Sequence, residues 1–340
     1  MDFKPRNTQG PFGALDAEYA AALEGCAVAD LSTFGRIEVT GTDRLDLLHR
    51  LSTNDLAGAQ AGEVRSTAFL TDKGRIIDRV LLVIRESSVM MITSPGAEAV
   101  LTHWIRKYTI TEDVSLAKVT DSTAMFCLLG PMIDSPILRL RGSHVPGNRW
   151  VPWPAGERGA LLAMRTESRD RFALLLASSA DAEKVWGSVA LPGVEGGCRP
   201  IGSIAYDAYR ISRGIPARPG ELAERHTPYD AGIREDISFT KGCYIGQEVV
   251  ARLDTYQKVR RRLVGVAFRE SAPGEPGQAL LKGGVEVGEL TSALQDRVMG
   301  KFLGLAVVAD AEAHPGDDVV AAGTHARGTI MPLPMNAAAA

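Results

Sequence analysis

The distribution of apolar and polar residues divides the chain into a long first part and a shorter second part. In the first part, segments with apolar residues three or four positions apart, typical of helices, alternate with short apolar runs typical of strands. The predicted helices are 12–24, a segment capped by Thr42 that carries Leu45, Leu48 and Leu51, a segment that follows Pro95-Gly96 and residues 203–212. The predicted strands are 35–40, 66–70, 75–85 and 89–93, with a hairpin turn at 72–74.

From Arg262 onward the pattern changes to short Val- and Leu-rich runs separated by Gly-Gly, Pro-Gly and Asp-Asp turns. Regularly spaced short strands with such turns predict a small β-barrel. The runs are 263–268, 285–291, 302–308, 318–321 and 327–331. The sequence therefore predicts an α+β region over residues 1–261 and a C-terminal β-barrel over residues 262–336, followed by a frayed tail at 337–340.

Two segments of the α+β region resemble each other weakly. Residues 91–94, followed by Ala-Glu-x-Val, have an echo in residues 176–179, which Ala-Glu-x-Val also follows after a short gap. Each predicts a strand, a serine turn and a helix. We therefore interpret the region as two related modules, about 1–50 with 120–261, and 51–119. Chance is the alternative, because strand–turn–helix units are common.

Composition and charge limit the classes of function. Of the 340 residues, 45% are apolar and 23% are charged, as in ordinary globular proteins, and the formal net charge of −3 argues against direct nucleic-acid binding. No apolar stretch is long enough to span a membrane, and the N-terminus lacks the apolar core of a signal peptide. The four cysteines show no CxxC and no metal-type spacing; they are Cys26, Cys127, Cys198 and Cys243. We expect a cytoplasmic protein with reduced cysteines and no metal site.

Residues 238–252 hold the densest group of unusual residues. Lys241, Gly242, Cys243 and Tyr244 place a cation, a flexible residue, a thiol and a phenol side by side. A helix is expected to begin directly afterwards; its first residues are Gly246, Gln247 and Glu248. A neighbouring ammonium and a helix N-terminus both favour a thiolate. We expect an accessible, reactive Cys243 whose ionised form Lys241 supports. The alternative is a small buried residue, the usual fate of a free cysteine.

This run resembles the K-G-C-Y-x-G-Q-E signature of the YgfZ family of folate-binding proteins, within the superfamily of the glycine-cleavage T-protein, an aminomethyltransferase. Weaker similarities follow in order; they are 30–32, 53–56, 73–78, 129–131, 209–216 and 227–228. The resemblance implies α+β folate-binding modules around a central channel, then a barrel, with the signature loop at the mouth of the channel. It also implies tetrahydrofolate or a related reduced folate as cofactor.

The resemblance points to further site residues. Asp78 lies in an apolar strand, where a carboxylate is costly unless it is paired or lines a cavity. T-proteins carry two aspartates there, but Arg79 replaces the second. They carry Asn-Ala where this chain has Thr93-Ser94, and a glutamate that binds the pterin where it has Ser212. The expected folate-binding residues are Asp78, Thr93, Ser94, Arg210, Ser212 and Tyr244, and the expected catalytic residues are Cys243, Asp78 and Lys241. An ion pair of Asp78 with Arg75 or Arg79, or its exposure, is the alternative.

Three hypotheses remain open from the sequence. The first is a YgfZ-like accessory protein that acts in assembly or repair of iron–sulfur cluster proteins and indirectly in tRNA modification, with an iron–sulfur client or assembly protein as partner. The second is a tetrahydrofolate-dependent aminomethyltransferase or demethylase. The third is a scaffold that has lost its ligand. The basic residues of 252–262 are interpreted as a solvated surface. The alternative is a docking patch for an acidic partner, a nucleic-acid backbone or a polyglutamate tail. These residues are Arg252, Lys258, Arg260, Arg261 and Arg262.

Overall fold

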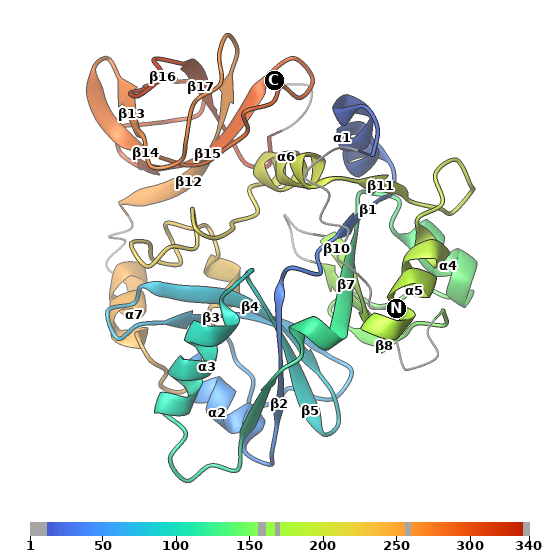
Figure 1. Ribbon diagram of the computed structural model, residues 1–340. Helices are drawn as coiled ribbons and strands as arrows, with labels where there is room; N and C mark the ends of the chain where they lie inside the picture. Colours follow the sequence, from blue (N-terminus) through green and yellow to red (C-terminus); the bar gives the residue numbers. More distant parts are fainter. Residues whose placement is uncertain (1–11, 156–160, 167–170, 256–259, 336–340) are drawn as a thin grey trace. The chain divides into compact units, whose positions relative to one another are not determined.

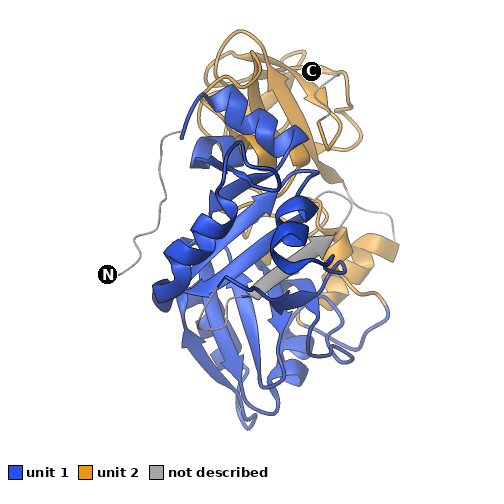
Figure 2. Cartoon of the chain, turned by 90° about the vertical axis from the view of Figure 1, so that its right-hand side faces the viewer, with its two compact units in different colours: residues 1–69, 78–206, 240–244 blue, residues 70–77, 207–239, 245–340 orange. Residues whose placement is uncertain are grey.

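The computed structural model describes residues 12–155, 161–166, 171–255 and 260–335. The predicted frayed tail and Lys258 lie outside these ranges. The chain forms two compact units (Figure 2). Unit 1 consists of residues 1–69, 78–206 and 240–244, and unit 2 of residues 70–77, 207–239 and 245–340.

Unit 1 contains a six-stranded sheet in the order β11-β1-β7-β10-β9-β8 (Figure 1). Its strands are β1 (Ala27–Asp30), β7 (Thr123–Leu129), β8 (Trp150–Pro152), β9 (Leu161–Thr166), β10 (Arg171–Ser178) and β11 (Arg199–Ile201). The strands are antiparallel except for the parallel pair β1–β11. Every second residue of β7 and β10 enters one buried apolar cluster that also holds residues of α4 (Asp134–Arg141) and α5 (Ala182–Val189). This alternation follows from the two-residue period of a strand.

Unit 1 also contains most of a five-stranded sheet in the order β3-β4-β5-β2-β6 (Figure 1). Its strands are β2 (Gly35–Thr40), β3 (Val64–Leu70), β4 (Ile76–Ile84), β5 (Ser88–Thr93) and β6 (Ser115–Lys118). β2 pairs with β5 and β6, so this sheet begins before residue 51. The predicted β3–β4 hairpin is present, with Thr71 N–H donating to Arg75 O and Gly74 at a left-handed φ of 67°.

Helices α2 (Arg44–Leu51) and α3 (Glu98–Lys107) accompany the five-stranded sheet and contact β5 and β2 respectively. The apolar residues of α2 that are buried are Leu47, Leu48 and Leu51. Thr42 does not cap this helix, contrary to the sequence-based prediction. Its backbone N–H and its hydroxyl both donate to the Asp113 carboxylate instead, because that side chain is nearby in three dimensions.

A buried arginine joins the two connections between the sheets of unit 1. Arg36 is fully buried, and its guanidinium donates to the carbonyl oxygens of Ser32, Phe34, Thr120 and Thr123 and to the Thr123 hydroxyl, at 2.6–3.1 Å. Residues 31–34 lead from β1 to β2, and residues 119–122 lead from β6 to β7. Burial lowers the pKa of Arg36 to about 10, so the side chain stays charged at neutral pH.

Unit 2 contains a closed six-stranded barrel in the order β12-β15-β14-β13-β16-β17. Its strands are β12 (Arg261–Phe268), β13 (Ala279–Lys282), β14 (Val285–Ala293), β15 (Phe302–Ala309), β16 (Asp318–Ala321) and β17 (Arg327–Met331). Its buried apolar residues form a cluster of their own. The predicted fold class, an α+β region followed by a small C-terminal β-barrel, is confirmed. Sequence reasoning missed β13, a four-residue strand bounded by glycines.

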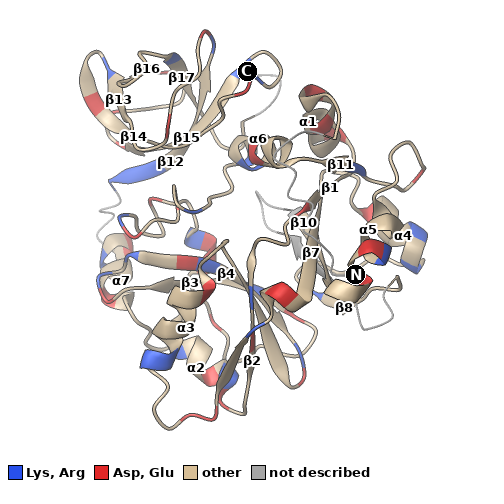
Figure 3. Ribbon diagram, in the orientation of Figure 1, with Lys and Arg blue, Asp and Glu red and all other residues tan. Residues whose placement is uncertain are grey.

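The rest of unit 2 is less regular. Helix α6 (Ser203–Arg213) starts in unit 1 and ends before Gly214, whose φ is 71°. Residues 214–233 contain turns, and the short helix η3 (Arg234–Asp236) and helix α7 (Gln247–Thr255) follow along the chain. At the start of β12, coloured by charge in Figure 3, Arg261 and Arg262 are ion-paired with Asp230 and Asp310 at 2.8 and 2.7 Å. This pairing favours the interpretation of the basic run as a solvated surface.

The expectation that all four cysteines are reduced is wrong in this structure. Cys26 and Cys198 form a buried disulfide with a Cα–Cα distance of 4.8 Å. Their sequence separation of 172 residues hid this pairing from spacing arguments. Cys127 is a buried free thiol and Cys243 is an exposed one. No helix in the described part of the chain is long and apolar enough to cross a membrane, and no cluster of three or more His, Cys, Asp or Glu residues suited to a metal ion occurs there.

Candidate functional site

Asp78 is the most constrained of the predicted site residues. It lies in β4 and is fully buried, so the alternative of simple exposure is wrong. Its carboxylate accepts two hydrogen bonds from Ser94, one from the backbone N–H at 2.9 Å and one from the hydroxyl at 2.7 Å. Ser94 is the first residue after β5, where the backbone turns toward α3. The structure therefore holds a buried carboxylate in a fixed orientation at the ends of two neighbouring strands.

Thr93 completes this end of the sheet. It is buried and pairs across the ladder with Gly35 in β2. A Cβ atom on Gly35 would lie 2.2 Å from Thr93 Oγ1 and 2.4 Å from Glu98 Cγ, so glycine is required at this position. The Thr93 hydroxyl donates to the carbonyl oxygen of Ser94 at 3.1 Å. The structure thus brings together Asp78 and the Thr93-Ser94 step, two places that the sequence singled out.

Lys241 of the signature run is buried and acts as an anchor. Its ammonium donates to the backbone carbonyl oxygens of His49, Ser52 and Asn54, the last two at 2.7 and 2.8 Å. Three bonds use all the hydrogens of an ammonium group. Burial lowers the pKa of Lys241 to about 8, and the Asp55 carboxylate opposes this shift. The residue therefore fixes the signature loop to residues 49–54, a contact that sequence reasoning did not predict.

The other residues of the signature loop differ from one another in solvent exposure. Gly242 and Cys243 are exposed, whereas Tyr244 is buried and its ring centroid lies 5.1 Å from the Lys241 ammonium. Burial raises the pKa of Tyr244 to about 12. Because Lys241 donates its three hydrogens to carbonyl groups, it has none for the Cys243 sulfur.

Gly246, Gln247 and Glu248 belong to unit 2; Gly246 directly precedes α7, which begins at Gln247. Gly246 has a left-handed φ of 84°, and a Cβ atom there would lie 2.6 Å from the carbonyl oxygen of Thr71. Only glycine fits this position without strain. Glu248 is exposed in the first turn of α7. Gly246 therefore has a structural reason to be glycine that is independent of any ligand.

Arg210 lies in the part of α6 that belongs to unit 2. Its guanidinium contacts the carboxylates of Asp207 at 2.6 Å and Glu221 at 3.7 Å, and the Ser292 hydroxyl at 3.2 Å. Glu221 is fully buried and also accepts a hydrogen bond from the Thr291 hydroxyl. Arg210 thus offsets the charge of a buried glutamate next to β14.

Ser212, which stands in place of the pterin-binding glutamate of T-proteins, is also buried in unit 2. Its hydroxyl donates to the carbonyl oxygen of Tyr209 within the same helix at 2.8 Å, and its own carbonyl accepts from Met335 N–H at 2.7 Å. The donor hydrogen of this hydroxyl is therefore used inside the helix.

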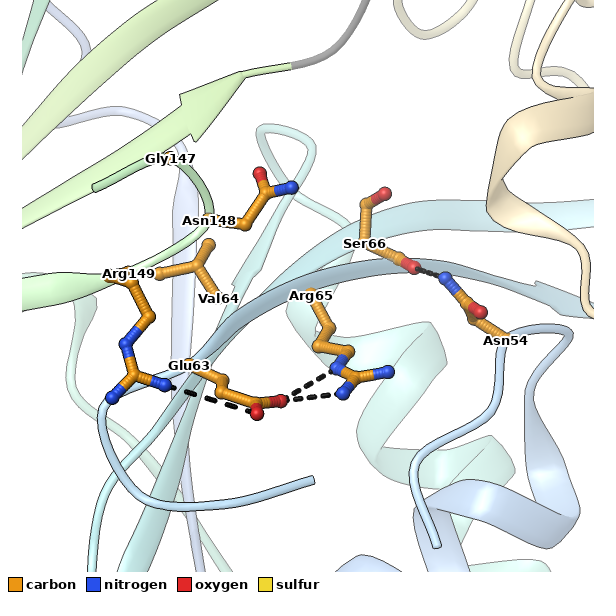
Figure 4. A pocket seen from close by; sticks show the side chains of 8 residues that line it. All are labelled: Asn54, Glu63, Val64, Arg65, Ser66, Gly147, Asn148 and Arg149. Atoms are coloured by element: carbon orange, nitrogen blue, oxygen red, sulfur yellow. Dashed lines mark hydrogen bonds and ion pairs between the residues drawn. The ribbon is translucent and has the colours of Figure 1, made fainter. Parts of the chain in front are cut away.

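Sequence reasoning missed a pocket of about 380 Å³ in unit 1 (Figure 4). It is lined by Asn54, Glu63, Val64, Arg65, Ser66, Gly147, Asn148 and Arg149. The two parts of its lining meet because Val64 N–H donates to Asn148 O at 2.8 Å, which places residues 148–149 beside the start of β3. No local sequence pattern predicts this contact. The pocket borders the anchor of the signature loop, since Asn54 lines it and also accepts from Lys241.

Comparisons with known protein domains and with known proteins agree with one another. Residues 2–141 match the GCVT N-terminal domain, and residues 261–335 match the glycine cleavage T-protein C-terminal barrel domain. The chloroplastic protein At1g60990 of Arabidopsis thaliana, which carries the provisional name of a transferase, is 32% identical over 87% of this chain and 68% of its own. The aminomethyltransferase of Halalkalibacterium halodurans is 26% identical over 91% of this chain and 86% of its own.

A solved structure supports the same fold. The glycine cleavage system aminomethyltransferase T from Bartonella henselae superposes with a TM-score of 0.78 over 95% of this chain and 90% of its own, at 17% identity. The order of domains, the closed barrel and the sequence matches agree with one another. This chain therefore belongs to the superfamily of the glycine-cleavage T-protein.

Proposed function

We propose that this protein is a folate-binding accessory protein similar to YgfZ, which acts in the assembly or repair of iron–sulfur cluster proteins and through them in tRNA modification. Its ligand is tetrahydrofolate or a related reduced folate, and its partner is an iron–sulfur client or assembly protein. The observation that carries the proposal is the exposed Cys243 on a loop that the buried Lys241 anchors.

The arrangement of Asp78 and Ser94 fits a reduced folate. The nitrogens of such a ligand carry N–H groups, and a carboxylate held in one orientation is a strong acceptor for them. Ser94 supplies that orientation through two bonds. Ser212 does not reproduce the role of the T-protein glutamate, because its hydroxyl is bound to Tyr209 O. Recognition of the pterin edge in this protein must therefore use other groups.

An accessory role is supported by the way in which the loop presents its thiol. A sulfur ligand for iron or a nucleophile needs access from outside, and Cys243 is exposed while its neighbours Lys241 and Tyr244 are buried. Two buried side chains around one exposed thiol give it a defined place at the surface. A purely structural cysteine is instead buried and inert, as Cys127 is.

The alternative function is a tetrahydrofolate-dependent aminomethyltransferase or demethylase. The buried Asp78 favours it, because a carboxylate near the reactive nitrogens of the ligand can orient them. Arg79 in place of the second aspartate and Ser212 in place of the glutamate argue against it. A site that has lost two positioned carboxylates loses both orientation and proton handling, and misorientation alone costs orders of magnitude in rate.

Calorimetric titration with several reduced folates tests the proposal. We expect binding by the wild type and weaker binding by Asp78→Asn, with thermal melts establishing that the variant is folded. A saturating folate should also slow alkylation of Cys243, with Cys243→Ala and Cys127→Ala assigning the labelled thiol. An absence of binding by every reduced folate would refute the proposal, and robust aminomethyl transfer from a lipoyl carrier protein to tetrahydrofolate would favour the alternative.

A further inference from the structure

The pocket of unit 1 has an excess of positive charge. Glu63 lies between two guanidinium groups: Arg65 Nε and Nη2 contact one of its oxygens at 2.9 and 2.6 Å, and Arg149 Nη1 lies 3.9 Å from the other (Figure 4). Two cations and one anion leave a net charge of +1. The side chains of Arg65 and Arg149 are partly exposed, so a ligand from solvent can reach both.

The guanidinium groups of Arg65 and Arg149 differ in how many hydrogen bonds they already make. Arg65 donates to Glu63 twice and to the backbone oxygen of Asp55 at 3.3 Å. Arg149 has no hydrogen bond through its guanidinium to any residue that the structure describes; its contact with Glu63 is longer than a hydrogen bond. A guanidinium presents five donors in a planar fork that matches a carboxylate. Arg149 is therefore the group of this pocket that an added carboxylate would engage.

Two sets of contacts connect the pocket with the signature loop and with the strand that carries Asp78. Asn54 donates through its amide to the carbonyl oxygen of Ser66 at 2.7 Å, and its own carbonyl holds Lys241 at 2.8 Å. Ser66 lies in β3, which pairs with β4, the strand that carries Asp78. A ligand held near Asp78 and the signature loop could therefore extend along β3 into this pocket.

We propose that this pocket binds the carboxylates of the glutamyl tail of a folate, with Arg149 as the principal contact and Arg65 as the second. The inference rests on the proposed function, because it assigns the anionic end of the same ligand. A volume of about 380 Å³ is within the usual range for small-molecule pockets and accommodates at least one glutamyl residue. Asn148 contributes an amide to the same lining (Figure 4).

Four probes test this tail site by calorimetric titration: pteroate, which has no glutamate; the mono- and pentaglutamate forms of 5-formyltetrahydrofolate; and p-aminobenzoyl-pentaglutamate, which has no pterin. We expect the wild type to bind the pentaglutamate at least tenfold more tightly than the monoglutamate, and to bind p-aminobenzoyl-pentaglutamate. Arg149→Gln should remove most of this preference and leave pteroate binding unchanged. Arg65→Gln should reduce the preference less, because Arg65 is already paired with Glu63.

Arg106→Gln is the matched control, since it removes an exposed arginine of unit 1 that lies outside the pocket. Thermal melts establish that each variant is folded. Equal affinity of the wild type for the two tail lengths, or a preference that survives both Arg149→Gln and Arg65→Gln, would overturn the tail site. Failure of the wild type to bind either form of 5-formyltetrahydrofolate would mark failure of the proposed function instead. In that case p-aminobenzoyl-pentaglutamate still decides the tail site, because its binding needs no pterin.

Discussion

Ser94 binds both carboxylate oxygens of Asp78, with its backbone N–H 2.9 Å from one and its hydroxyl 2.7 Å from the other. Because Asp78 is fully buried, these bonds replace hydration that the carboxylate loses on folding. The arrangement depends on chain position. Ser94 follows the last residue of β5, so its N–H points to the side chain of the neighbouring strand and not into the ladder.

The first prediction concerns the hydroxyl of Ser94. Ser94→Ala keeps the backbone bond to Asp78 and removes the second bond, so the free energy of unfolding should fall by about 1–3 kcal/mol. Binding of a reduced folate should weaken as well, since the carboxylate is held less firmly. Urea denaturation and calorimetric titration measure the two effects.

Ser178→Ala is the matched control. Ser178 also donates to a nearby carboxylate, that of Asp181 at 3.0 Å, but in the other sheet of unit 1. Its loss should destabilise the protein without changing folate affinity. If both variants weaken binding equally, the effect of Ser94 comes from general loss of stability and not from the orientation of Asp78.

The second prediction concerns Arg36. Arg36→Met leaves the carbonyl oxygens of Ser32, Phe34, Thr120 and Thr123 without their buried donor, so it should lower the free energy of unfolding by about 3 kcal/mol or more. Arg36→Lys should recover only part of this loss, because an ammonium has three donors and no planar fork. Arg106→Met, on an exposed side of α3, should change stability by no more than about 0.5 kcal/mol. A small effect of Arg36→Met in urea denaturation would show that water replaces the guanidinium.

The third prediction concerns acid stability. His226 is fully buried, and neither ring nitrogen has a hydrogen-bond partner among the described residues. Burial lowers its pKa below the usual 6.5, and Arg225 and Arg261 lower it further, whereas Asp230 and Glu289 oppose them. The unfolded state therefore binds the proton first as the pH falls.

Stability should consequently decline from about pH 6.5 down through the lowered pKa of His226, with a slope of up to about 1.4 kcal/mol per pH unit from this residue. His226→Leu should show a shallower decline in urea denaturation between pH 7 and pH 5. His103→Leu, which removes an exposed histidine, should keep the wild-type slope. Identical slopes for the wild type and His226→Leu would mean that the buried ring is protonated without cost.

Local patterns in the sequence predicted the parts of the fold that local patterns control. The alternation at 35–40 gave the bounds of β2, and the turn residues at 72–74 gave the hairpin. The change in composition at Arg262 located the barrel to within one residue of β12. In contrast, β7 was missed, because residues 124–129 are all buried and such a run lacks the two-residue period of a strand. Its place beside β1 and β10 depends on distant segments.

In the candidate site, too, some features follow from the local sequence and others depend on distant segments. Asp78 stood out because a charged residue interrupts an apolar strand, and its burial agrees with that signal. Two contacts join segments that are far apart in the chain, so the spacing of residues in the sequence could not reveal them. They are the contact of Lys241 with residues 49–54 and the disulfide between Cys26 and Cys198. Arg149 carries no local signal at all. Its place in the pocket follows from backbone pairing of residue 148 with the start of β3.

The last prediction concerns alkaline stability and Lys241. Burial lowers its pKa from 10.5 to about 8 in the folded protein, whereas the three carbonyl bonds oppose this fall, because an ammonium makes them best. Between these two pKa values the unfolded state binds more protons than the folded state. The free energy of unfolding of the wild type should therefore rise, relative to that of Lys241→Met, as the pH increases from about 8 to 10.5. The total gain has an upper limit of about 3 kcal/mol.

Urea denaturation of both proteins at a series of pH values measures this difference. Lys73→Met is the control, since Lys73 is exposed in the β3–β4 turn and its removal should leave the pH dependence of the wild type unchanged. Parallel curves for the wild type and Lys241→Met would show an ordinary pKa for Lys241. A wild-type curve that falls relative to the variant would show that the carbonyl bonds outweigh desolvation and raise the pKa. Either result would mean that the anchor of the signature loop stays charged well above neutral pH.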